Sequence, residues 1–254
     1  MKTYRIDLGK SVIDIPLSPI QCETSTIKSI STFDVNNRNE DTPEELSTFL
    51  QLAKGKKRFM DIGAQHGLFS LAYLSQNPDG QAFSFEGGFN PYLGALQNKI
   101  LNKSDNWHLF NMMIGDVDKL VKVCSEEKQT LALPGGEGNE NRMMFSVDTV
   151  NKLFDIRPDI IKMDIEGCES RAFKGMKQTI NDHEPILCME IHPKLVQRYG
   201  GSIDQILEFQ KLIEYDVYDI SLGLIENYEH ILRTEQKDSH RSVWLNKHYR
   251  KLWK

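Results

Sequence analysis

The sequence predicts an α/β domain built on a doubly wound, mostly parallel sheet of seven strands. Short apolar runs alternate with segments in which apolar residues recur every three or four positions, the pattern of strands alternating with helices. The first such pair, Lys57 to Gln76, joins a strand to a helix through a turn with two glycines. The length of 254 residues fits one domain of this class. We therefore expect a domain over residues 42–254, preceded by a short N-terminal β/α extension over residues 1–41.

The N-terminal extension should contain two short strands, over residues 4–8 and 12–15, with a turn between them at Gly9 and Lys10. Residues 21–41 are polar, rich in asparagine, and match no element. Thr42-Pro43-Glu44-Glu45 is a capping box with proline at the first helical position, so a helix should run to about Ala53 and end at Gly55. Capping accounts for both glutamates, although a contact between either one and a ligand stays open.

Seven apolar runs of strand length follow this helix. We expect strands over residues 59–62, 81–86, 107–114, 159–163, 185–189, 217–221 and 242–245. A helix should cover Leu68 to Gln76, a second should begin at Asn90-Pro91, and a third should follow the fourth strand. A fourth should begin at the capping box Ser202 to Gln205. The later three helices should bury the stripes Leu93, Leu96, Ile100 and Leu101; Ala172, Phe173, Met176 and Ile180; and Ile203, Ile206, Leu207 and Ile213.

Residues 119–147 are the least regular part of the chain. Within them, residues 131–141 form a glycine-rich loop that we expect to be mobile. Such a loop could act as a lid over an acceptor substrate or be an ordinary surface loop, and the sequence favours neither.

Composition narrows the classes of function. A formal net charge of −5 argues against a general nucleic-acid binder, which needs a basic face. Residues 241–254 are basic, and we favour a solvated end over a membrane or anion contact. No apolar run approaches the length of a membrane span, and the N-terminus lacks a secretory signal. The four cysteines form no C-x-x-C pair, and Cys188 should be a buried free thiol. We therefore expect a reduced, cytoplasmic protein.

Charged side chains stand at the ends of the predicted strands. In a doubly wound sheet, ligands bind outside the carboxyl ends of the strands. The residues at these ends are Asp61, Glu86, Asp116, Asp164, Glu190 and His192. Because the fourth and fifth strands should be neighbours, Asp164, Glu190 and His192 should converge in one pocket together with Glu166. Carboxylates gathered in one place raise the pKa of each other and of a histidine among them, which suggests function more than stability.

Glu86 ends the second core strand about 20 residues after Gly67, the spacing expected of a ribose-binding carboxylate. A carboxylate can accept hydrogen bonds from both hydroxyl groups of a ribose. The turn before it has glycines only at Gly63 and Gly67, whereas a dinucleotide site needs G-x-G-x-x-G. An NAD(P)-dependent reductase is therefore the weaker enzymatic alternative.

The residue pattern resembles the FkbM family of S-adenosylmethionine (SAM)-dependent methyltransferases. The matching pieces lie in the family's order over residues 58–193. They are Met60-Asp-Ile-Gly-Ala-Gln-His-Gly67, Phe85-Glu86 with Asn90, Ile114-Gly-Asp116, Ser146-Val-Asp-Thr149, Asp159-Ile-Ile-Lys-Met-Asp-Ile-Glu-Gly-Cys-Glu169, Lys174-Gly175 and Glu190-Ile-His-Pro193. The sequence departs from the usual pattern at Gly87-Gly88 and at His66.

The resemblance implies a class I, Rossmann-like methyltransferase whose sheet ends in an antiparallel edge. It implies SAM as the cofactor and O-methylation of a hydroxyl on a sugar or another small natural-product acceptor. The cofactor-binding residues would be Asp61, Gly63, Ala64, Gln65, Gly67, Glu86 and Asp116, with Asp116 facing the adenine amino group. The catalytic residues would be Asp164, Glu166, Glu190 and His192.

An alcohol becomes a good nucleophile only when a base or a metal assists the loss of its proton. In one hypothesis, His192 or Asp164 is the general base. In the other, Asp164 with Glu190 or His192 holds a divalent cation, for which oxygen ligands would favour Mg²⁺. We favour the metal-free version because local spacing spells out no ligand set.

Two further readings stay open beside the reductase. A nucleic-acid N-methyltransferase would carry a proline-rich turn after the fourth strand, where this chain has Asp164-Ile-Glu-Gly167. A catalytically inactive SAM-binding scaffold would act through protein contacts. The acids at the ends of the fourth and fifth strands count against it.

Overall fold

The structure is a computed structural model that describes residues 2–7, 12–17, 42–125, 130–131, 138–234 and 238–251. Its side chains are described over 44–123, 138–234 and 238–249. The predicted turn at Gly9, the polar segment 21–41, the capping contacts of Thr42 and most of the glycine-rich loop lie outside these residues.

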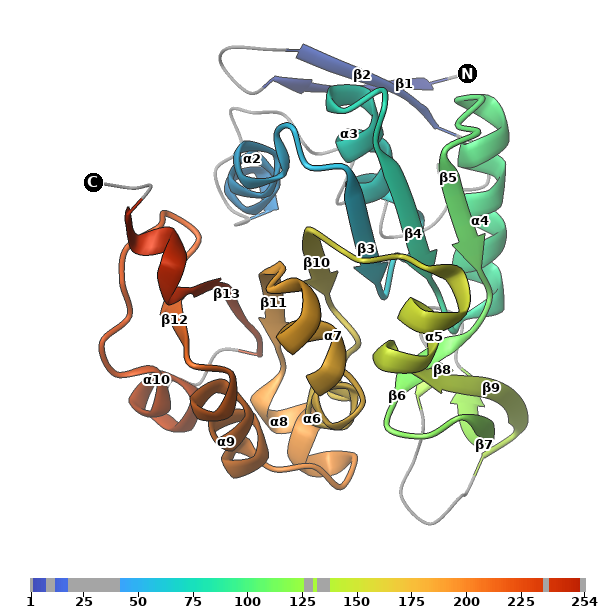
Figure 1. Cartoon of the computed structure of the whole chain (residues 1–254). Helices are drawn as coiled ribbons and strands as arrows, with labels where there is room; N and C mark the ends of the chain where they lie inside the picture. The colour runs from blue at the N-terminus through green and yellow to red at the C-terminus, as the bar shows by residue number, and fades with distance from the viewer. Residues whose placement is uncertain are drawn as a thin grey trace.

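A seven-stranded sheet forms the centre of the molecule, as predicted (Figure 1). Its order is β12 (Tyr215–Tyr218), β13 (His240–Asn246), β11 (Ile186–Ile191), β10 (Ile160–Met163), β3 (Arg58–Ile62), β4 (Gln81–Phe85) and β5 (Trp107–Phe110). The neighbours from β11 to β5 pair in parallel, and β13 runs antiparallel to both β11 and β12. The predicted α/β fold with an antiparallel edge is thus confirmed.

Helices cover both faces of the sheet, because successive strand residues point to opposite sides. On β3, Phe59 packs into a core with α2 (Thr42–Ala53), α3 (Leu68–Gln76) and α4 (Phe89–Leu101). Met60 packs into the other core. That core contains residues of α5 (Val147–Phe154), α6 (Glu169–Lys174), α7 (Lys177–His183), α8 (Pro193–Arg198), α9 (Ile203–Ile213) and α10 (Tyr228–Thr234). The sheet is therefore doubly wound.

The N-terminal hairpin pairs β1 (Lys2–Asp7) with β2 (Val12–Leu17) in antiparallel register. Both predicted strands are present, each with bounds that differ by one or two residues. The hairpin lies across the end of the molecule where α3 and α4 stand, and β2 contacts both helices (Figure 1).

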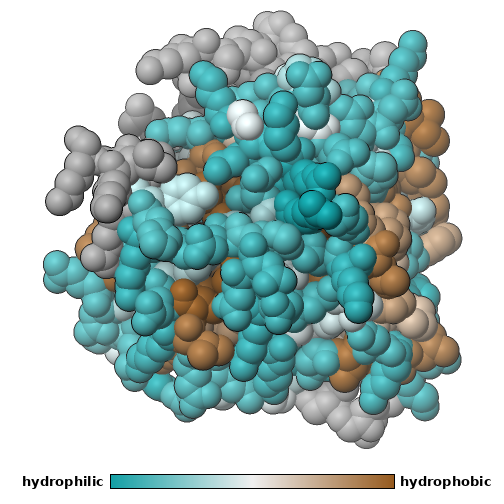
Figure 2. All heavy atoms as spheres, in the orientation of Figure 1, coloured by the Kyte–Doolittle hydropathy of each residue, from teal (hydrophilic) through white to brown (hydrophobic). Residues whose placement is uncertain are grey.

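The apolar stripe predicted for α4 is wrong. The helix begins at Phe89, with Gly88 as N-cap, and buries Gly94 and Asn98. Leu93 and Ile100 face outward, with 37% and 67% of their surfaces exposed. Figure 2 shows brown, hydrophobic residues along the edge of the molecule where Figure 1 draws α4. The face of α4 with Gly94 and Asn98 turns inward because the His66 side chain packs closely against Gly94. The backbone carbonyl of His66 also accepts a hydrogen bond from the Asn98 side chain.

The single strand predicted over residues 107–114 is two strands. β5 ends at Phe110, and β6 (Met113–Gly115) leaves the main sheet to pair with β9 (Glu140–Ser146). With β7 (Lys119–Ser125) and β8 (Thr130–Leu131) they form a small sheet in the order β6-β9-β7-β8. The stretch 119–147, expected to be irregular, therefore contains regular structure, and the strands of this small sheet lie at the lower right in Figure 1.

The helix predicted after the fourth strand is also two elements. α6 and α7 are separated by Gly175, whose added Cβ would lie 2.4 Å from the carbonyl oxygen of Gly115. The predicted inward residues, Ala172, Phe173, Met176 and Ile180, are nevertheless all buried. Three α-helices of the described residues, α5, α8 and α10, lie where no helix was predicted. Ser202 is the N-cap of α9, since its hydroxyl accepts from the Gln205 backbone N–H. The return contact of a capping box is absent among the described residues, because Oε1 of Gln205 has no hydrogen-bond partner there.

Two smaller expectations are also settled. Cys188 is buried and free, as predicted. Within the described residues, no helix combines the length and apolar character needed to cross a membrane.

Candidate active site

The ends of β3, β4, β10 and β11, which carry all predicted strand-end residues except Asp116, meet at one rim of the main sheet (Figure 1). From β3 the chain passes to β4 and β5 on one side, whereas β10 and β11 lie on the other. The order of strands therefore switches between β3 and β10, and ligands of doubly wound folds bind at such a point.

The turn between β3 and α3 requires glycine at two positions. Gly63 and Gly67 both have a φ of +81°. A Cβ at Gly63 would lie 1.7 Å from the carbonyl oxygen of Asp164, and a Cβ at Gly67 would lie 2.1 Å from the Trp107 ring. Because no side chain fits at either place, the turn packs directly on the end of β10 and on β5.

Glu86 holds this turn from the side. Its Oε2 accepts a hydrogen bond of 2.8 Å from the Gln65 backbone N–H, and its Oε1 accepts one of 2.7 Å from the N–H of Gly88. Gln65 itself has a φ of +49°. Burial raises the pKa of Glu86 to about 7, against the effect of the two N–H donors. Each carboxylate oxygen has a second lone pair, so hydrogen bonds from a ligand can be added.

Asp61 lies below the turn and is almost fully buried. Ser70 of α3 donates a hydrogen bond of 2.6 Å to its Oδ2, and the Ser70 hydroxyl lies 2.7 Å from that of Ser84 on β4. The Trp107 ring N–H donates to the same Ser84 oxygen. Burial raises the pKa of Asp61 to about 6. The hydrogen bond from Ser70 to Asp61 therefore links α3 to the end of β3, where the turn begins.

Asp116 follows β6, a strand of the small sheet. Its Oδ1 accepts two hydrogen bonds from Arg171 of α6, at 2.9 and 2.7 Å. This ion pair ties the end of β6 to α6, and both side chains are about one quarter exposed.

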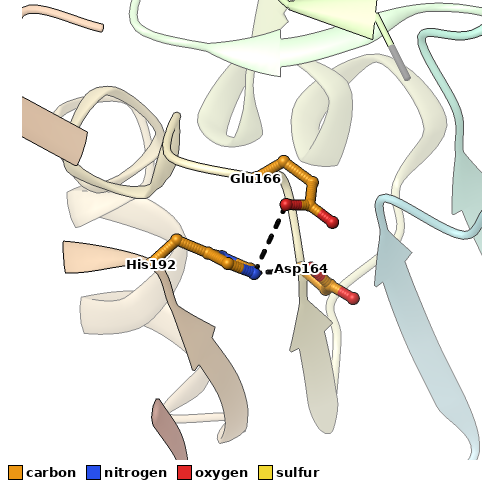
Figure 3. Close-up of side chains that lie close together, drawn as sticks. All are labelled: Asp164, Glu166 and His192. Carbon is orange, nitrogen blue, oxygen red and sulfur yellow. Dashed lines mark ion pairs between the residues drawn. The ribbon is translucent and has the colours of Figure 1, made fainter. Parts of the chain in front are cut away.

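A cluster of four acids surrounds His192, which follows β11. Figure 3 shows two of them, Asp164 and Glu166, beside the imidazole ring. Its Nε2 lies 3.5 Å from Glu166, 3.8 Å from Glu190 and 3.9 Å from Asp164. Its Nδ1 lies 2.9 Å from Oε1 of Glu169, a fully buried carboxylate on α6. The structure thus brings together Asp164, Glu166, Glu190 and His192. Glu166 has a φ of +52°, a strained value that is frequent at functional sites.

Burial and the neighbouring charges shift the pKa values of the residues in this cluster. Burial alone would lower the pKa of His192, but its hydrogen bond to Glu169 and the nearby carboxylates raise it to about 9. Burial raises the pKa of Asp164, although Lys162 works against it. Burial would also raise the pKa of Glu190, but Arg241 and Lys162 hold it below its usual value. At neutral pH the cluster therefore contains an imidazolium among carboxyl groups.

Three charged residues of this rim were not among the predicted site residues: Lys162, Arg241 and Glu45. Lys162 is buried, with its Nζ 3.5 Å from Oδ2 of Asp164 and 4.6 Å from the centre of the Phe69 ring. Arg241 lies in β13 and pairs with Glu190 at 3.2 Å and with Glu45 of α2 at 3.1 Å. Arg241 is therefore part of the site and does not belong to a solvated basic tail.

Glu45 is buried as well, burial raises its pKa to about 6, and its ion pair with Arg241 joins α2 to the rim. A signal for Lys162 was present: two residues apart on one strand, Lys162 and Asp164 must share a face of the sheet.

Three of these side chains could hold a cation. One ligand atom each from Asp164, Glu166 and His192 lies within 4.8 Å of the others. The predicted metal alternative used Asp164 with Glu190 or His192, whereas the observed group contains Glu166 and not Glu190. The two carboxylate oxygens of Glu190 accept hydrogen bonds from Ser239 and Arg241 instead.

The comparisons with known proteins address the family of the chain. Residues 61–217, more than half of the chain, match the methyltransferase FkbM domain. The chain belongs to the FkbM methyltransferase family. This domain match contains every strand-end residue named above as far as His192. No curated protein matches the chain in sequence.

Solved structures with a similar fold are distant in sequence. The methyltransferase FkbM from Methylobacillus flagellatus KT has 19% identity and a TM-score of 0.47, over 74% of this chain. The match spans only 43% of that protein. A TehB-like SAM-dependent methyltransferase from Corynebacterium glutamicum has 11% identity and a TM-score of 0.46, over 91% of this chain and 100% of its own.

Proposed function

We propose that this FkbM-family chain is a SAM-dependent methyltransferase that methylates a hydroxyl group of a sugar or another small natural-product acceptor. One observation carries the proposal: the glycine turn of β3 abuts the very residue, Asp164, that begins the acid and histidine cluster. A methyl donor on the turn and an acceptor beside the cluster would then be neighbours, as a direct transfer between them requires.

The turn suits the part of the donor that carries no phosphate. Its glycines let the backbone come close to a ligand, and the start of α3 offers N–H groups. Glu86 would accept hydrogen bonds from the ribose hydroxyls. The remaining lining of the donor site would come from Asp61, Gly63, Ala64, Gln65 and Gly67. Asp116 would face the adenine. When bound, SAM supplies an electrophilic methyl group on a positively charged sulfur.

Asp164 is the better candidate for the general base. His192, with a pKa of about 9, is protonated at neutral pH and cannot take a second proton. Oδ1 of Asp164 is buried and accepts no hydrogen bond from the described residues. We therefore assign Asp164 to remove the acceptor proton, with the His192 imidazolium stabilising the charge that results. Glu166 and Glu190 would orient this pair. The reaction then needs no metal.

Two alternatives differ from this proposal in what they bind and do. A reductase would bind NAD(P), and an inactive scaffold would bind SAM without transferring its methyl group. Thermal shift with SAM, S-adenosylhomocysteine (SAH) and NAD separates the reductase from the other two. Radiolabelled SAM incubated with pools of hydroxylated sugars and small natural products tests the transfer itself.

The proposal expects stabilisation by SAM and SAH but not by NAD, and label in an organic product. Full transfer in EDTA would support the metal-free version, whereas activity restored only by Mg²⁺ would favour the set Asp164, Glu166 and His192. Stabilisation by NAD alone would contradict the proposed cofactor.

A further inference from the structure

Glu169 has no role in the chemistry proposed so far, yet it is the most enclosed carboxylate of the rim. It begins α6 and is 0% exposed. Its Oε1 accepts a hydrogen bond of 3.0 Å from the Gly167 backbone N–H and lies 2.9 Å from Nδ1 of His192. Its Oε2 receives no hydrogen bond from the described part of the chain. A carboxylate so placed is costly to bury, and that cost suggests a function for it.

We infer that Glu169 is the positioning residue for His192, fixing the imidazole so that Nδ1 carries a proton and Nε2 faces Asp164 and Glu166. The inference deepens the proposed function, on which its consequence for catalysis rests.

Distances single out Glu169 among the four acids. The carboxylates of Asp164, Glu166 and Glu190 lie between 3.5 and 3.9 Å from Nε2. Those separations allow electrostatic attraction but are too long for a good hydrogen bond, and hydrogen bonds fix orientation. Only the contact with Glu169, at 2.9 Å, has hydrogen-bond length. Glu169 is itself held by the N–H of Gly167, so its oxygen is a fixed reference point.

The chemistry of the pair sets the direction of the bond. An ionised carboxylate only accepts, so Nδ1 must donate, and the other ring nitrogen is then the one presented to the rim. Burial lowers the pKa of His192, but this hydrogen bond and the charge of the nearby carboxylates raise it by more, to about 9. A histidine free to rotate would present either nitrogen, and its charge would be poorly aligned with Asp164.

Two variants of Glu169 distinguish its role as a hydrogen-bond acceptor for Nδ1 of His192 from the role of its negative charge. In Glu169→Gln, the Gly167 N–H keeps a carbonyl oxygen at the Oε1 position, so the acceptor for Nδ1 remains. In Glu169→Met, a side chain of similar length has no acceptor. Ser170→Ala is the matched control: Ser170 is the next residue of α6, is 1% exposed, and its hydroxyl has no hydrogen-bond partner among the described residues.

The direct test is ¹⁵N NMR of histidine-labelled protein without ligands, at a pH above 9 where His192 is neutral, with the His192 signals assigned through His192→Gln. We expect a solvent-protected proton on Nδ1 in the wild type, in Glu169→Gln and in Ser170→Ala, and its loss in Glu169→Met. Kinetics should follow: in Glu169→Met, kcat falls on the order of 10²-fold, while KM for SAM stays within about twofold. Glu169→Gln should recover part of that loss.

A wild-type ring protonated only on Nε2 when neutral would overturn the inference without any variant, even if Glu169→Met fails to fold. An unchanged Nδ1 proton in a folded Glu169→Met protein would also overturn it. If the wild type holds the Nδ1 proton but transfers no methyl group, the proposed function fails while the placement of His192 by Glu169 is supported.

Discussion

The ammonium group of Lys162 lies 3.5 Å from Oδ2 of Asp164, and the Lys162 side chain is buried in the protein. Lys162 lies beside Asp61 in the register of β10 and β3, and the two side chains share the face covered by α2 and α3. Burial lowers the pKa of Lys162, but Asp164, Glu45, Asp61 and Glu190 together raise it. One buried cation thus balances acids from four different elements.

Replacing this cation should destabilise the protein in a pH-dependent way. In Lys162→Met the ammonium is lost, and the carboxylates around it are left uncompensated. Removing one partner of a buried ion pair costs about 3–5 kcal/mol. The loss should be larger at pH 8 than at pH 5, because at pH 5 the acids can take up protons. Chemical denaturation at both pH values measures it, with the exposed Lys152→Met as control. Equal losses at both pH values would show that Lys162 does not balance these acids.

Removing the proposed base should affect the rate and not the binding of the donor. Asp164→Asn keeps the size of the side chain but cannot accept the acceptor proton. We expect kcat to fall by about 10²–10⁴-fold, while the affinity for SAH changes little. Steady-state kinetics and calorimetry measure the two quantities. A variant with wild-type kcat would remove Asp164 from the chemistry.

The pH dependence of the rate should be bell-shaped. Activity should rise as Asp164 loses its proton, at a pH above the ordinary value for aspartate because burial raises its pKa. Activity should fall again as pH passes through about 9, where His192 loses its proton. A profile of kcat/KM from pH 5 to 10 records both limbs. If His192 were the base instead, the rate would continue to rise through pH 9.

Glu86 should couple donor binding to pH. Its folded pKa of about 7 lies above the ordinary value of 4.5, so its ionisation lowers the stability of the free protein as pH rises from about 4.5 to 7. Ribose hydroxyls would donate to the ionised form, so the affinity for SAH should increase through pH 7, by at most about tenfold per pH unit.

The variant Glu86→Gln should lose this pH dependence, and because one backbone N–H of the turn loses its acceptor, it should also cost about 1–3 kcal/mol of stability. Asp79→Asn, on an exposed turn, should keep the wild-type dependence. Calorimetric titrations at pH 6, 7 and 8 give the slope, and a flat wild-type slope would contradict the contact with ribose.

The strands of the core follow from local patterns, because short apolar runs bounded by glycine or acid have few alternatives. The α4 stripe did not follow, since Leu93 and Ile100 have helical spacing but Gly94 and Asn98 are the residues that fit beneath His66. The split between β5 and β6 depends on pairing with β9, about 30 residues later, which no local pattern contains.

The convergence of Asp164 and His192 could be predicted, because parallel strand ends meet at one edge. Residues that enter the site from distant elements could not. Glu45 comes from a helix before the first core strand, and Arg241 comes from the last strand. Their meeting with Glu190 depends on β13 pairing with β11, and on the packing of α2 against the sheet. The contact of Glu169 with His192 could not be predicted either, since 23 residues separate the two in the chain.

Calorimetric titration of SAH into the wild type and two glycine variants tests the central claim most directly. Gly63 and Gly55 both have positive φ, but a Cβ at Gly63 would collide with the Asp164 carbonyl, whereas nothing lies within 4 Å of one at Gly55. Backbone strain alone costs roughly 1–2 kcal/mol in each variant. We predict one SAH bound per wild-type chain, unchanged affinity in Gly55→Ala, and affinity at least about 100-fold weaker in folded Gly63→Ala. A wild type that does not bind SAH, or a Gly63→Ala variant that binds it as tightly as the wild type, would contradict a donor site at this turn.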